Sequence, residues 1–283
     1  MQTLTPRSLL SDIAFGEGPR WRDDRLYFSD MHSHVVLTVD LEGKRREVCT
    51  VPNAPSGLGW LPDGRMLVVS MTDRRLLRLE EDGRLCEVAD LSEHAAYHCN
   101  DMVVDARGRA YVGNFGWDLH GGGTPQPAVL VLVNPDGALR VAAEDLKFPN
   151  GCVITPDGGT LVVGETMGRR LTAFDIEEDG SLSHRRVWAE TPGILPDGIC
   201  LDAEGAIWVA SPESQGCFRI LEGGEITHKV EVETDAFACM LGGPERKHLF
   251  LCTAGSSQPE ACAQHRDGRI EVVEVDVAGV GLP

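Results

Sequence analysis

The chain has 283 residues, of which 42% are hydrophobic, and it contains 32 Gly and 16 Pro. This composition can fill a sizeable core, and Gly and Pro spread along a chain are typical of many short strands joined by turns rather than of disorder. The formal charge of −18 argues against a nucleic-acid partner, because phosphate binding needs clustered Lys and Arg.

The nine Cys residues argue against a disulfide framework and a zinc ribbon, because their number is odd and no C-x-x-C pair occurs. Reduced thiols in a cytosolic protein are the simpler interpretation. The N-terminal segment lacks the apolar stretch of a signal peptide, and no run approaches the roughly 18 apolar residues that cross a bilayer. We therefore expect a cytoplasmic protein with no membrane partner.

A turn signal between two apolar runs occurs six times, at intervals of roughly 40 to 50 residues, which indicates a repeat architecture. Each turn is followed by a short run rich in β-branched and aromatic residues, and no helical stripe of useful length accompanies it. The turns and the runs that follow them are 22–25 with 26–28, 62–65 with 66–69, 106–109 with 110–112, 156–159 with 161–163, 203–205 with 207–209, and 244–247 with 249–251.

Each repeat contains a second turn of Asp-Gly or Glu-Gly type, which predicts another hairpin because Gly adopts positive φ without a steric cost. Each repeat is thus predicted to be a four-stranded antiparallel meander, and six of them predict a single-domain, all-β, six-bladed β-propeller over residues 1–283. The last repeat ends at its third strand, 269–277, and we expect residues 3–10 to supply the fourth. The second turns are 41–44, 81–84, 135–137, 178–180, 222–224 and 266–268.

One residue in each repeat lies eight positions before the first turn, and strand alternation places all six on one face. They share that face with the loops after each second strand, of which 115–127 and 254–265 are long enough to frame a pocket mouth. The six residues are Glu17, Ser56, Asn100, Asn150, Asp197 and Cys239.

Four of these positions carry oxygen ligands: Glu17, Asn100, Asn150 and Asp197. An all-oxygen set favours a hard divalent cation, Ca²⁺ first, with Mg²⁺, Mn²⁺, Zn²⁺ and Fe²⁺ as alternatives. Close approach of the backbone to such an ion would explain the Gly after Asn150 and after Asp197. Asn-Gly and Asp-Gly are also common turn pairs, but turns alone do not require the shared register of all four residues.

Four motifs, in this order and spacing, resemble those of the gluconolactonase / senescence marker protein (regucalcin) family over residues 12–253. They are 15–19 (Phe-Gly-Glu-Gly-Pro), 100–101 (Asn-Asp), 149–151 (Pro-Asn-Gly) and 196–200 (Pro-Asp-Gly-Ile-Cys). The resemblance implies a six-bladed propeller with one divalent metal held by Glu17, Asn150 and Asp197. Asn100 would lie beside them, in contact with the substrate or a metal-bound water. It further implies a small-molecule lactone or ester substrate and a carboxylic ester hydrolase of the lactonase type.

The mechanism that follows assigns catalysis to Asp197 and Asn100. The ion would polarise the lactone carbonyl, and Asp197 would take a proton from the attacking water, unless a metal-bound hydroxide attacks directly. Asn100 would hold the carbonyl or the water.

We expect four further residues to contact the substrate: His98, Trp117, Asp118 and Glu165. His98 stands where sugar-lactonase members of the family often carry an Arg that contacts substrate hydroxyls. With the low polarity of residues 113–118, this difference argues against an aldonolactone substrate more than against the metal site.

Two alternatives stay open at this point. One is a non-enzymatic propeller scaffold that binds partners across a face, and the other is a phosphotriesterase-like hydrolase on the same fold. No HExxH helix and no G-x-S-x-G elbow occurs, and we expect ordinary roles for the remaining histidines. The sequence specifies neither the lactone nor the physiological metal nor the oligomeric state.

Overall fold

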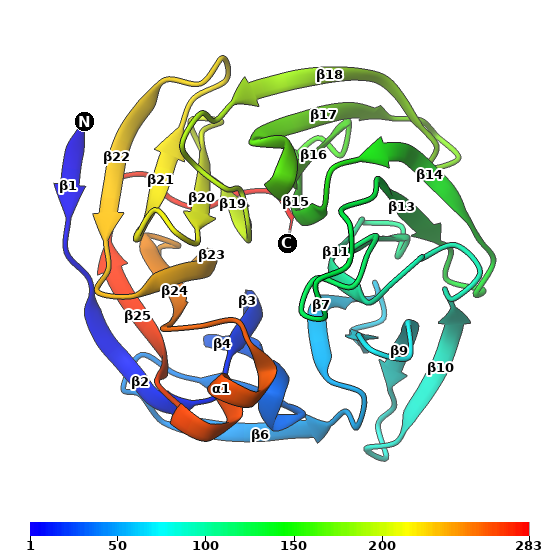
Figure 1. Cartoon of the computed structure of the whole chain (residues 1–283), viewed down its shortest axis with the longest axis horizontal. Coiled ribbons are helices and arrows are strands. Elements are labelled where there is room, and N and C mark those ends of the chain that lie inside the picture. Colours follow the sequence, from blue (N-terminus) through cyan, green and yellow to red (C-terminus); the bar gives the residue numbers. More distant parts are fainter. Residues whose placement is uncertain (283) are drawn as a thin grey trace.

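The computed structural model describes residues 1–282 and arranges its strands in six antiparallel sheets around a central axis (Figure 1). Within each sheet the strands follow one another in sequence from the axis outward, except that two N-terminal strands lie outermost in the last two sheets. Turns such as the one at Gly83, with φ of 82°, link successive strands of the blades. This arrangement confirms the predicted six-bladed propeller with four antiparallel strands in each blade.

The blades are defined by the following strands. The first three are β3 (Gly16–Arg22), β4 (Arg25–Asp30), β5 (Val35–Val39) and β6 (Arg45–Thr50); β7 (Pro55–Trp60), β8 (Met66–Ser70), β9 (Arg75–Leu79) and β10 (Leu85–Asp90); and β11 (Cys99–Val104), β12 (Ala110–Asn114), β13 (Ala128–Val133) and β14 (Leu139–Leu146). The last three are β15 (Pro149–Ile154), β16 (Thr160–Glu165), β17 (Arg170–Ile176) and β18 (Leu182–Glu190); β19 (Ile199–Leu201), β20 (Ile207–Ser211), β21 (Gly216–Ile220) and β22 (Ile226–Glu231); and β23 (Asp235–Gly242), β24 (His248–Ala254) and β25 (Gly268–Glu274) with β2 (Arg7–Ile13).

The N-terminal segment closes the ring, as expected, but it does so in two pieces. β2 pairs antiparallel with β25 and completes the sixth blade, whereas β1 (Gln2–Leu4) pairs parallel with β22 on the outside of the fifth. The predicted segment 3–10 thus supplies the fourth strand from Arg7 onward, and that strand continues to Ile13. Pro6 lies between the two pieces and has no backbone N–H for a sheet, which explains the break.

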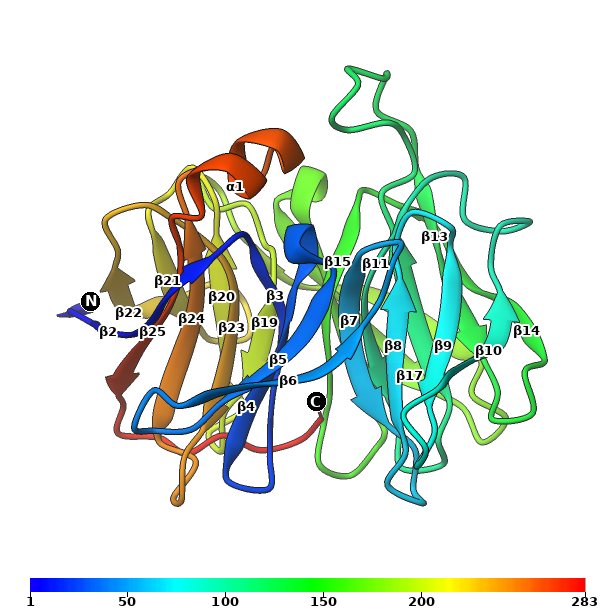
Figure 2. The ribbon, with the colours of Figure 1, turned by 90° about the horizontal axis from the view of Figure 1, so that it is seen from below.

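The C-terminal segment crosses the ring near the axis, on the side away from the helix α1 (Pro259–His265) (Figures 1 and 2). Gly279 forms a β-bridge with Asp202, and Leu282 forms one with Ile154, where the two residues exchange backbone hydrogen bonds of 2.8 and 3.0 Å. The segment thereby ties the fourth and fifth blades together at that end of the axis.

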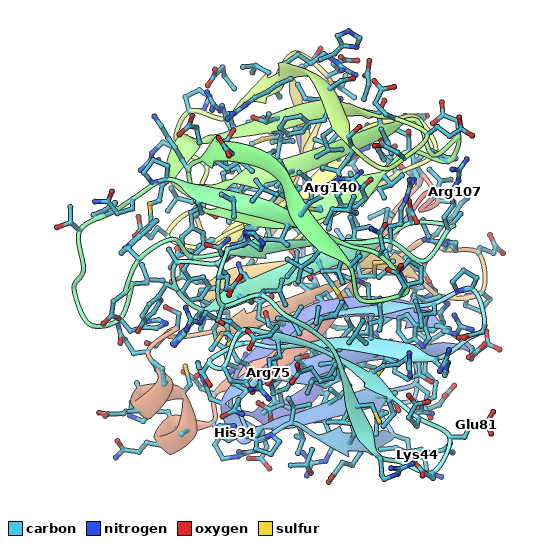
Figure 3. The ribbon with its side chains drawn as sticks, turned by 90° about the vertical axis from the view of Figure 1, so that its right-hand side faces the viewer. His34, Lys44, Arg75, Glu81, Arg107 and Arg140 are labelled. Atoms are coloured by element: carbon cyan, nitrogen blue, oxygen red, sulfur yellow. The ribbon has the colours of Figure 1, made fainter. Side chains whose placement is uncertain are left out.

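The face opposite the C-terminal segment carries the two long loops, as the sequence predicts. α1 and the loop between β12 and β13 both project from it (Figures 2 and 3). The predicted loop 254–265 contains this helix. Pro259 is its first residue, and Arg266, which follows its last residue, adopts the left-handed conformation that commonly ends a helix. Two single 3₁₀ turns, Met31–Ser33 and Thr166–Gly168, follow β4 and β16 on the same face. No helix within residues 1–282 is long and apolar enough to cross a bilayer.

Side-chain to backbone hydrogen bonds also join neighbouring blades away from that face. Arg107 and Arg140 of the third blade donate to the carbonyl oxygens of Glu178 and Asp179 in the fourth, at 2.7 and 2.8 Å (Figure 3). These contacts hold the rims of two blades together around the axis.

The glycines that follow Asn150 and Asp197 serve the packing of the blades. A Cβ on Gly151 would lie 2.6 Å from the amide nitrogen of Ile199, and one on Gly198 would lie 2.6 Å from the Cα of Ala238. Each innermost strand thus approaches the backbone of the next one too closely for any side chain. The explanation of these glycines by an approaching ion is wrong, since neighbouring protein backbone fills the space.

Candidate active site

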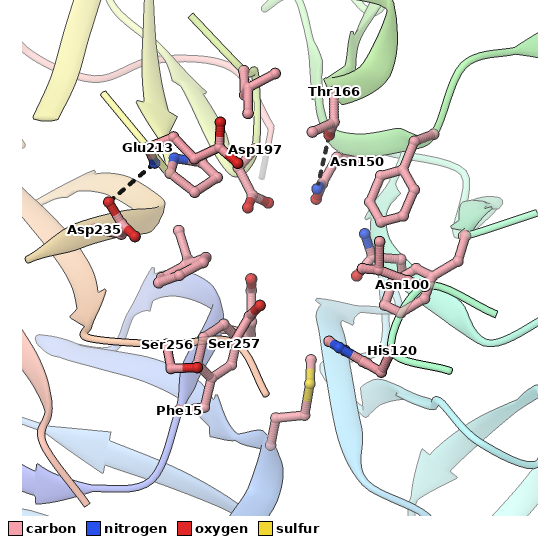
Figure 4. A pocket seen from close by; sticks show the side chains of 18 of the residues that line it. Phe15, Asn100, His120, Asn150, Thr166, Asp197, Glu213, Asp235, Ser256 and Ser257 are labelled. Atoms are coloured by element: carbon pink, nitrogen blue, oxygen red, sulfur yellow. Dashed lines mark hydrogen bonds between the residues drawn. The ribbon is translucent and has the colours of Figure 1, made fainter. Parts of the chain in front are cut away.

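The face with the long loops contains a cavity of about 390 Å³ at the propeller axis, and every blade except the second contributes to it (Figure 4). The four predicted oxygen ligands lie at its floor among aromatic and aliphatic side chains. Its lining consists of Phe15, Glu17, Met31, His32, Asn100, Phe115, Leu119, His120, Phe148, Asn150, Thr166, Met167, Leu195, Asp197, Pro212, Glu213, Asp235, Phe237, Gly255, Ser256 and Ser257.

Glu17, Asn100 and Asn150 reach the cavity from innermost strands that are irregular where these residues lie. The pairing registers shift between Glu17 and Arg20 in β3, and also next to Asn100 in β11 and Asn150 in β15. A bulge of this kind redirects a side chain, here toward the axis. Asp197 precedes β19 and is held by a backbone hydrogen bond to Ala210. Strand alternation and a repeated irregularity therefore bring four distant residues into one cavity.

The sixth blade departs from the predicted register, because Phe237 lines the cavity and Cys239 does not. β23 is eight residues long and shifts register between Ala236 and Ala238, so the eight-residue spacing selects the wrong side chain. Cys239 is buried in the core, with its Sγ 3.8 Å from that of Cys200.

Hydrogen bonds fix the orientation of both amides in the cavity. Asn150 Nδ2 donates to Thr166 Oγ1 at 3.2 Å, and that hydroxyl donates to the Pro196 carbonyl at 2.6 Å (Figure 4). Asn150 Oδ1 is left buried without a partner. Asn100 has the reverse arrangement, because its Oδ1 accepts from Ser56 Oγ at 3.4 Å and its Nδ2 remains as the donor for a ligand.

Both carboxyl groups of the set are buried and have raised pKa values. Burial raises the pKa of Glu17 well above its ordinary value, and repulsion from Asp197 and Asp101 adds to the effect. The pKa of Asp197 is also raised well above its ordinary value, first by burial and then by Asp101. Asp197 Oδ1, like Asn150 Oδ1, has no hydrogen-bond partner. The cavity thus holds two carboxyl groups, and one oxygen of Asp197 and the oxygen of Asn150 are buried without a partner. This arrangement fits a divalent cation with oxygen ligands.

The composition of this set differs from a centre built on His and Cys. Within residues 1–282 no three His, Cys, Asp or Glu side chains gather in a metal-binding arrangement. The cavity offers two carboxylates, Glu17 and Asp197, and takes its further oxygen from Asn150. Such a set suits hard cations better than a thiolate or imidazole site would.

Of the predicted substrate contacts, Asn100 lies in the cavity lining and the other four lie outside it. Glu165 is buried next to it and accepts hydrogen bonds from Arg170 at 2.9 Å, Thr172 at 2.5 Å and the amide of Lys147 at 2.8 Å. Its carboxylate thus joins strands of the fourth blade.

The other three predicted contacts pack in and under the loop after β12. Trp117 packs edge-on against Phe148 with a centroid distance of 5.2 Å, and Asp118 accepts from the Gly121 amide at 2.7 Å. His98 stacks on Tyr97 at 4.1 Å. In their place Phe115, His120 and Thr166 face the cavity.

Two histidines on the cavity wall were expected to have ordinary roles. Burial is the main cause that lowers the pKa of His32 to about 4, and burial also lowers the pKa of His120. Both imidazoles are therefore neutral near pH 7. Both residues lie on loops after second strands, a position that the sequence does mark as part of the site face.

The fold and the site together define a class of protein: a six-bladed propeller with carboxylate and amide oxygens gathered at one end of its axis. Comparison with known families assigns the chain to one family within this class. The sequence model described as SMP-30/Gluconolactonase/LRE-like region matches residues 15–255, and the chain therefore belongs to this family. This confirms the resemblance seen in the sequence motifs.

Similar proteins cover almost the whole chain. A pentonolactonase of Haloferax volcanii is 29% identical over 95% of this chain and 92% of its own length. A 6-deoxy-6-sulfogluconolactonase of Pseudomonas putida is 25% identical over 95% of this chain and 94% of its own. The fold is also that of a calcium-binding regucalcin from Agrobacterium tumefaciens, with a TM-score of 0.83 and 21% identity over 100% of this chain and 98% of the other.

Proposed function

We propose that this chain is a metal-dependent lactonase, a carboxylic ester hydrolase that opens a cyclic ester. The observation that carries the proposal is the pair of buried oxygens, Asn150 Oδ1 and Asp197 Oδ1, that have no partner beside the buried carboxyl of Glu17. The family and the names of the lactonase relatives support the reaction class.

Glu17, Asn150 and Asp197 would hold one divalent cation. When bound, the ion supplies Lewis-acid polarisation of an ester carbonyl. Glu17 and Asp197 bring negative charge, and Asn150 is oriented by Thr166 so that its oxygen faces the cavity. Ca²⁺ is the first candidate because all ligands are oxygens.

Asp197 and Asn100 would carry out the remaining chemistry. Asp197 accepts a proton from the water that attacks the acyl carbon, a role that its place in the cavity lining allows. Asn100 donates from Nδ2 to the carbonyl oxygen as negative charge develops there. The ring C–O bond then breaks, the leaving alkoxide takes the proton, and a hydroxy acid is released.

The test is elemental analysis of the purified protein, combined with lactone hydrolysis before and after chelation and with add-back of each divalent cation. We expect about one ion per chain, because the proposed ligands form one site. Activity should be lost on chelation and restored when the ion is added back. Asp197→Asn and Glu17→Gln should abolish turnover while circular dichroism stays unchanged. Glu222→Gln, at an exposed turn, is the matched control and should keep full activity.

Two outcomes would contradict the proposal. Full activity of chelated Glu17→Gln protein would exclude the ion from the reaction. Absence of any divalent cation, with no affinity for one, would make these residues structural and favour a propeller that binds partners without catalysis.

A further inference from the structure

Four phenylalanine rings from four different blades surround the cavity above the oxygen ligands. Phe15 and Phe237 contact each other with a centroid distance of 4.7 Å, and Phe115 and Phe148 stack at 4.8 Å. All four line the cavity, the first pair from the first and sixth blades and the second pair from the third and fourth, and we call them the phenylalanine collar. A substrate bound in this cavity would therefore contact these rings.

The apolar surface continues from the collar to the cavity mouth. Met31, Leu119, Met167 and Leu195 also line the cavity. Met167 is 45% exposed, which is unusual for a large hydrophobic side chain in this protein, and it lies on the 3₁₀ turn after β16. An exposed apolar side chain at the mouth of an apolar cavity is where a hydrophobic ligand would first make contact.

Among the polar groups of the wall, His32 Nε2 and His120 Nδ1 are buried without a partner, but other groups are already engaged within the protein. Thr166 Oγ1 already donates to Pro196 and accepts from Asn150, and Asp235 accepts from the backbone amide of Glu213 at 3.0 Å. Each sugar hydroxyl that lost water against the phenyl rings without a new partner would weaken binding. An alkyl or aromatic substituent would instead gain from burial.

The charges on the wall are of one sign. Glu17, Asp197, Glu213 and Asp235 line the cavity, and no Lys or Arg does so among the described residues. Even with one divalent cation bound, no positive charge remains for a sulfonate, phosphate or carboxylate on the substrate. An anionic substituent would therefore be repelled.

We infer that the substrate is an uncharged lactone with an aromatic or alkyl substituent packed against the phenylalanine collar, and that polyhydroxylated and anionic lactones are poor substrates. This inference rests on the proposed function, since it names the class of lactone for the same site. It also separates this chain from its relative named for a sulfonated sugar lactone.

The first experiment compares kcat/KM for three lactones on the cation-loaded full chain: dihydrocoumarin, glucono-δ-lactone and a sulfonated gluconolactone. We expect dihydrocoumarin to exceed each of the others by about tenfold or more, because a mismatched polar group in an apolar pocket commonly costs that much. Higher kcat/KM for glucono-δ-lactone than for dihydrocoumarin would overturn the inference while leaving the lactonase proposal intact.

A binding measurement tests the inferred preference of the cavity independently of the proposed hydrolysis. Calorimetry with the lactam analogues of dihydrocoumarin and of gluconolactone reports the preference of the cavity without turnover. Tighter binding of the aromatic lactam, with a negative heat-capacity change, supports the inference even if no lactone is hydrolysed and the proposed reaction is wrong. Equal or tighter binding of the sugar lactam overturns it.

A charge variant tests the exclusion of anions. Met167→Arg places a cation at the mouth and should raise kcat/KM for the sulfonated lactone about threefold to tenfold at low salt, an effect that fades as salt is added. Val187→Arg is the matched control, because Val187 is 50% exposed on β18 and does not line the cavity. An equal effect of both variants, or no effect of Met167→Arg, would contradict the exclusion of anions by the wall.

Discussion

Arg20 donates a hydrogen bond from Nη2 to Asp101 Oδ1 at 2.6 Å, and this ion pair joins the first blade to the third. The same guanidinium donates to the carbonyl oxygen of Leu58 in the second blade at 3.0 Å. Both charged side chains are buried, with exposed fractions of 3% and 4%. One arginine thus links three innermost strands close to the cavity floor, and it offsets the charge of an aspartate that raises the pKa values of Glu17 and Asp197.

Arg20→Met should lower the free energy of unfolding by about 3–5 kcal/mol, because it leaves the carboxylate of Asp101 buried without its ion-pair partner. Chemical denaturation monitored by tryptophan fluorescence measures this. The double variant Arg20→Met/Asp101→Leu should lose less than the two single variants combined. Arg84→Met, which removes an exposed pair with Asp82, should cost at most about 1 kcal/mol. A loss for Arg20→Met no greater than for Arg84→Met would show that the buried pair does not hold the blades.

Gly151→Ala should lower the free energy of unfolding by about 1–3 kcal/mol, because the added methyl group would meet the backbone of the fifth blade. It should also weaken cation binding, since the adjacent Asn150 would be displaced. Gly159→Ala is the control, because a Cβ there lies no closer than 3.5 Å to other atoms on an exposed turn. If Gly151→Ala matched this control in a thermal melt, close blade packing would not be what requires glycine at this position.

The blades and the gathering of four polar residues in one cavity could be predicted because both depend on short-range patterns. Turn spacing locates each hairpin, and the alternation of strands places Glu17, Asn100, Asn150 and Asp197 on one face. The prediction that Cys239 occupies the sixth position failed because a bulge shifts the register of β23 and brings Phe237 to the cavity, and nothing in the local spacing signals it.

The loop residues that line the cavity could not be predicted because neighbours in a loop point in opposite directions. Thr166 faces the cavity while Glu165 bonds to Arg170, and His120 faces it while Asp118 accepts from the Gly121 amide. Which of two adjacent polar residues turns inward depends on tertiary contacts, such as the arginines that hold Glu165. A sequence pattern indicates the loop, and only the packing selects the residue.

Glu165→Gln should destabilise the fold rather than impair substrate binding. Burial disfavours the charged form of Glu165, but hydrogen bonds from Arg170, Thr172 and the Lys147 amide outweigh it and lower the pKa. A group whose pKa is lowered on folding stabilises the protein above its ordinary pKa, and this contribution is lost as the pH falls. We expect a loss of about 2–3 kcal/mol at pH 7 that shrinks below about pH 4. A raised KM with unchanged stability would instead support the substrate contact predicted from the sequence.

Thr166→Val should lower the affinity for the divalent cation by about tenfold, as is common when a residue that orients a ligand is removed. The valine would remove the hydroxyl that accepts from Asn150 Nδ2, so the amide could rotate and turn its oxygen away from the cavity. Thr166→Ser keeps the hydroxyl and is the matched control. Calorimetric titration of each variant with Ca²⁺ measures the affinity directly. Equal affinities for the valine and serine variants would show that Asn150 does not need this hydrogen bond.

Stabilisation of the protein by the cation should increase with pH. Burial raises the pKa values of Glu17 and Asp197 in the cation-free protein, and repulsion from Asp101 adds to both, so both groups favour folding below their ordinary pKa and lose that contribution as the pH rises. A divalent cation needs both groups ionised and compensates their charge, which couples its binding to proton release.

The rise in melting temperature on adding Ca²⁺ should therefore be larger at pH 8 than at pH 5. Calorimetry in buffers of different ionisation enthalpy should detect released protons at pH 5 to 6. The Glu17→Gln/Asp197→Asn variant should show neither effect. A cation effect that is equal at pH 5 and pH 8, with no proton release, would place the binding site away from these two carboxyl groups.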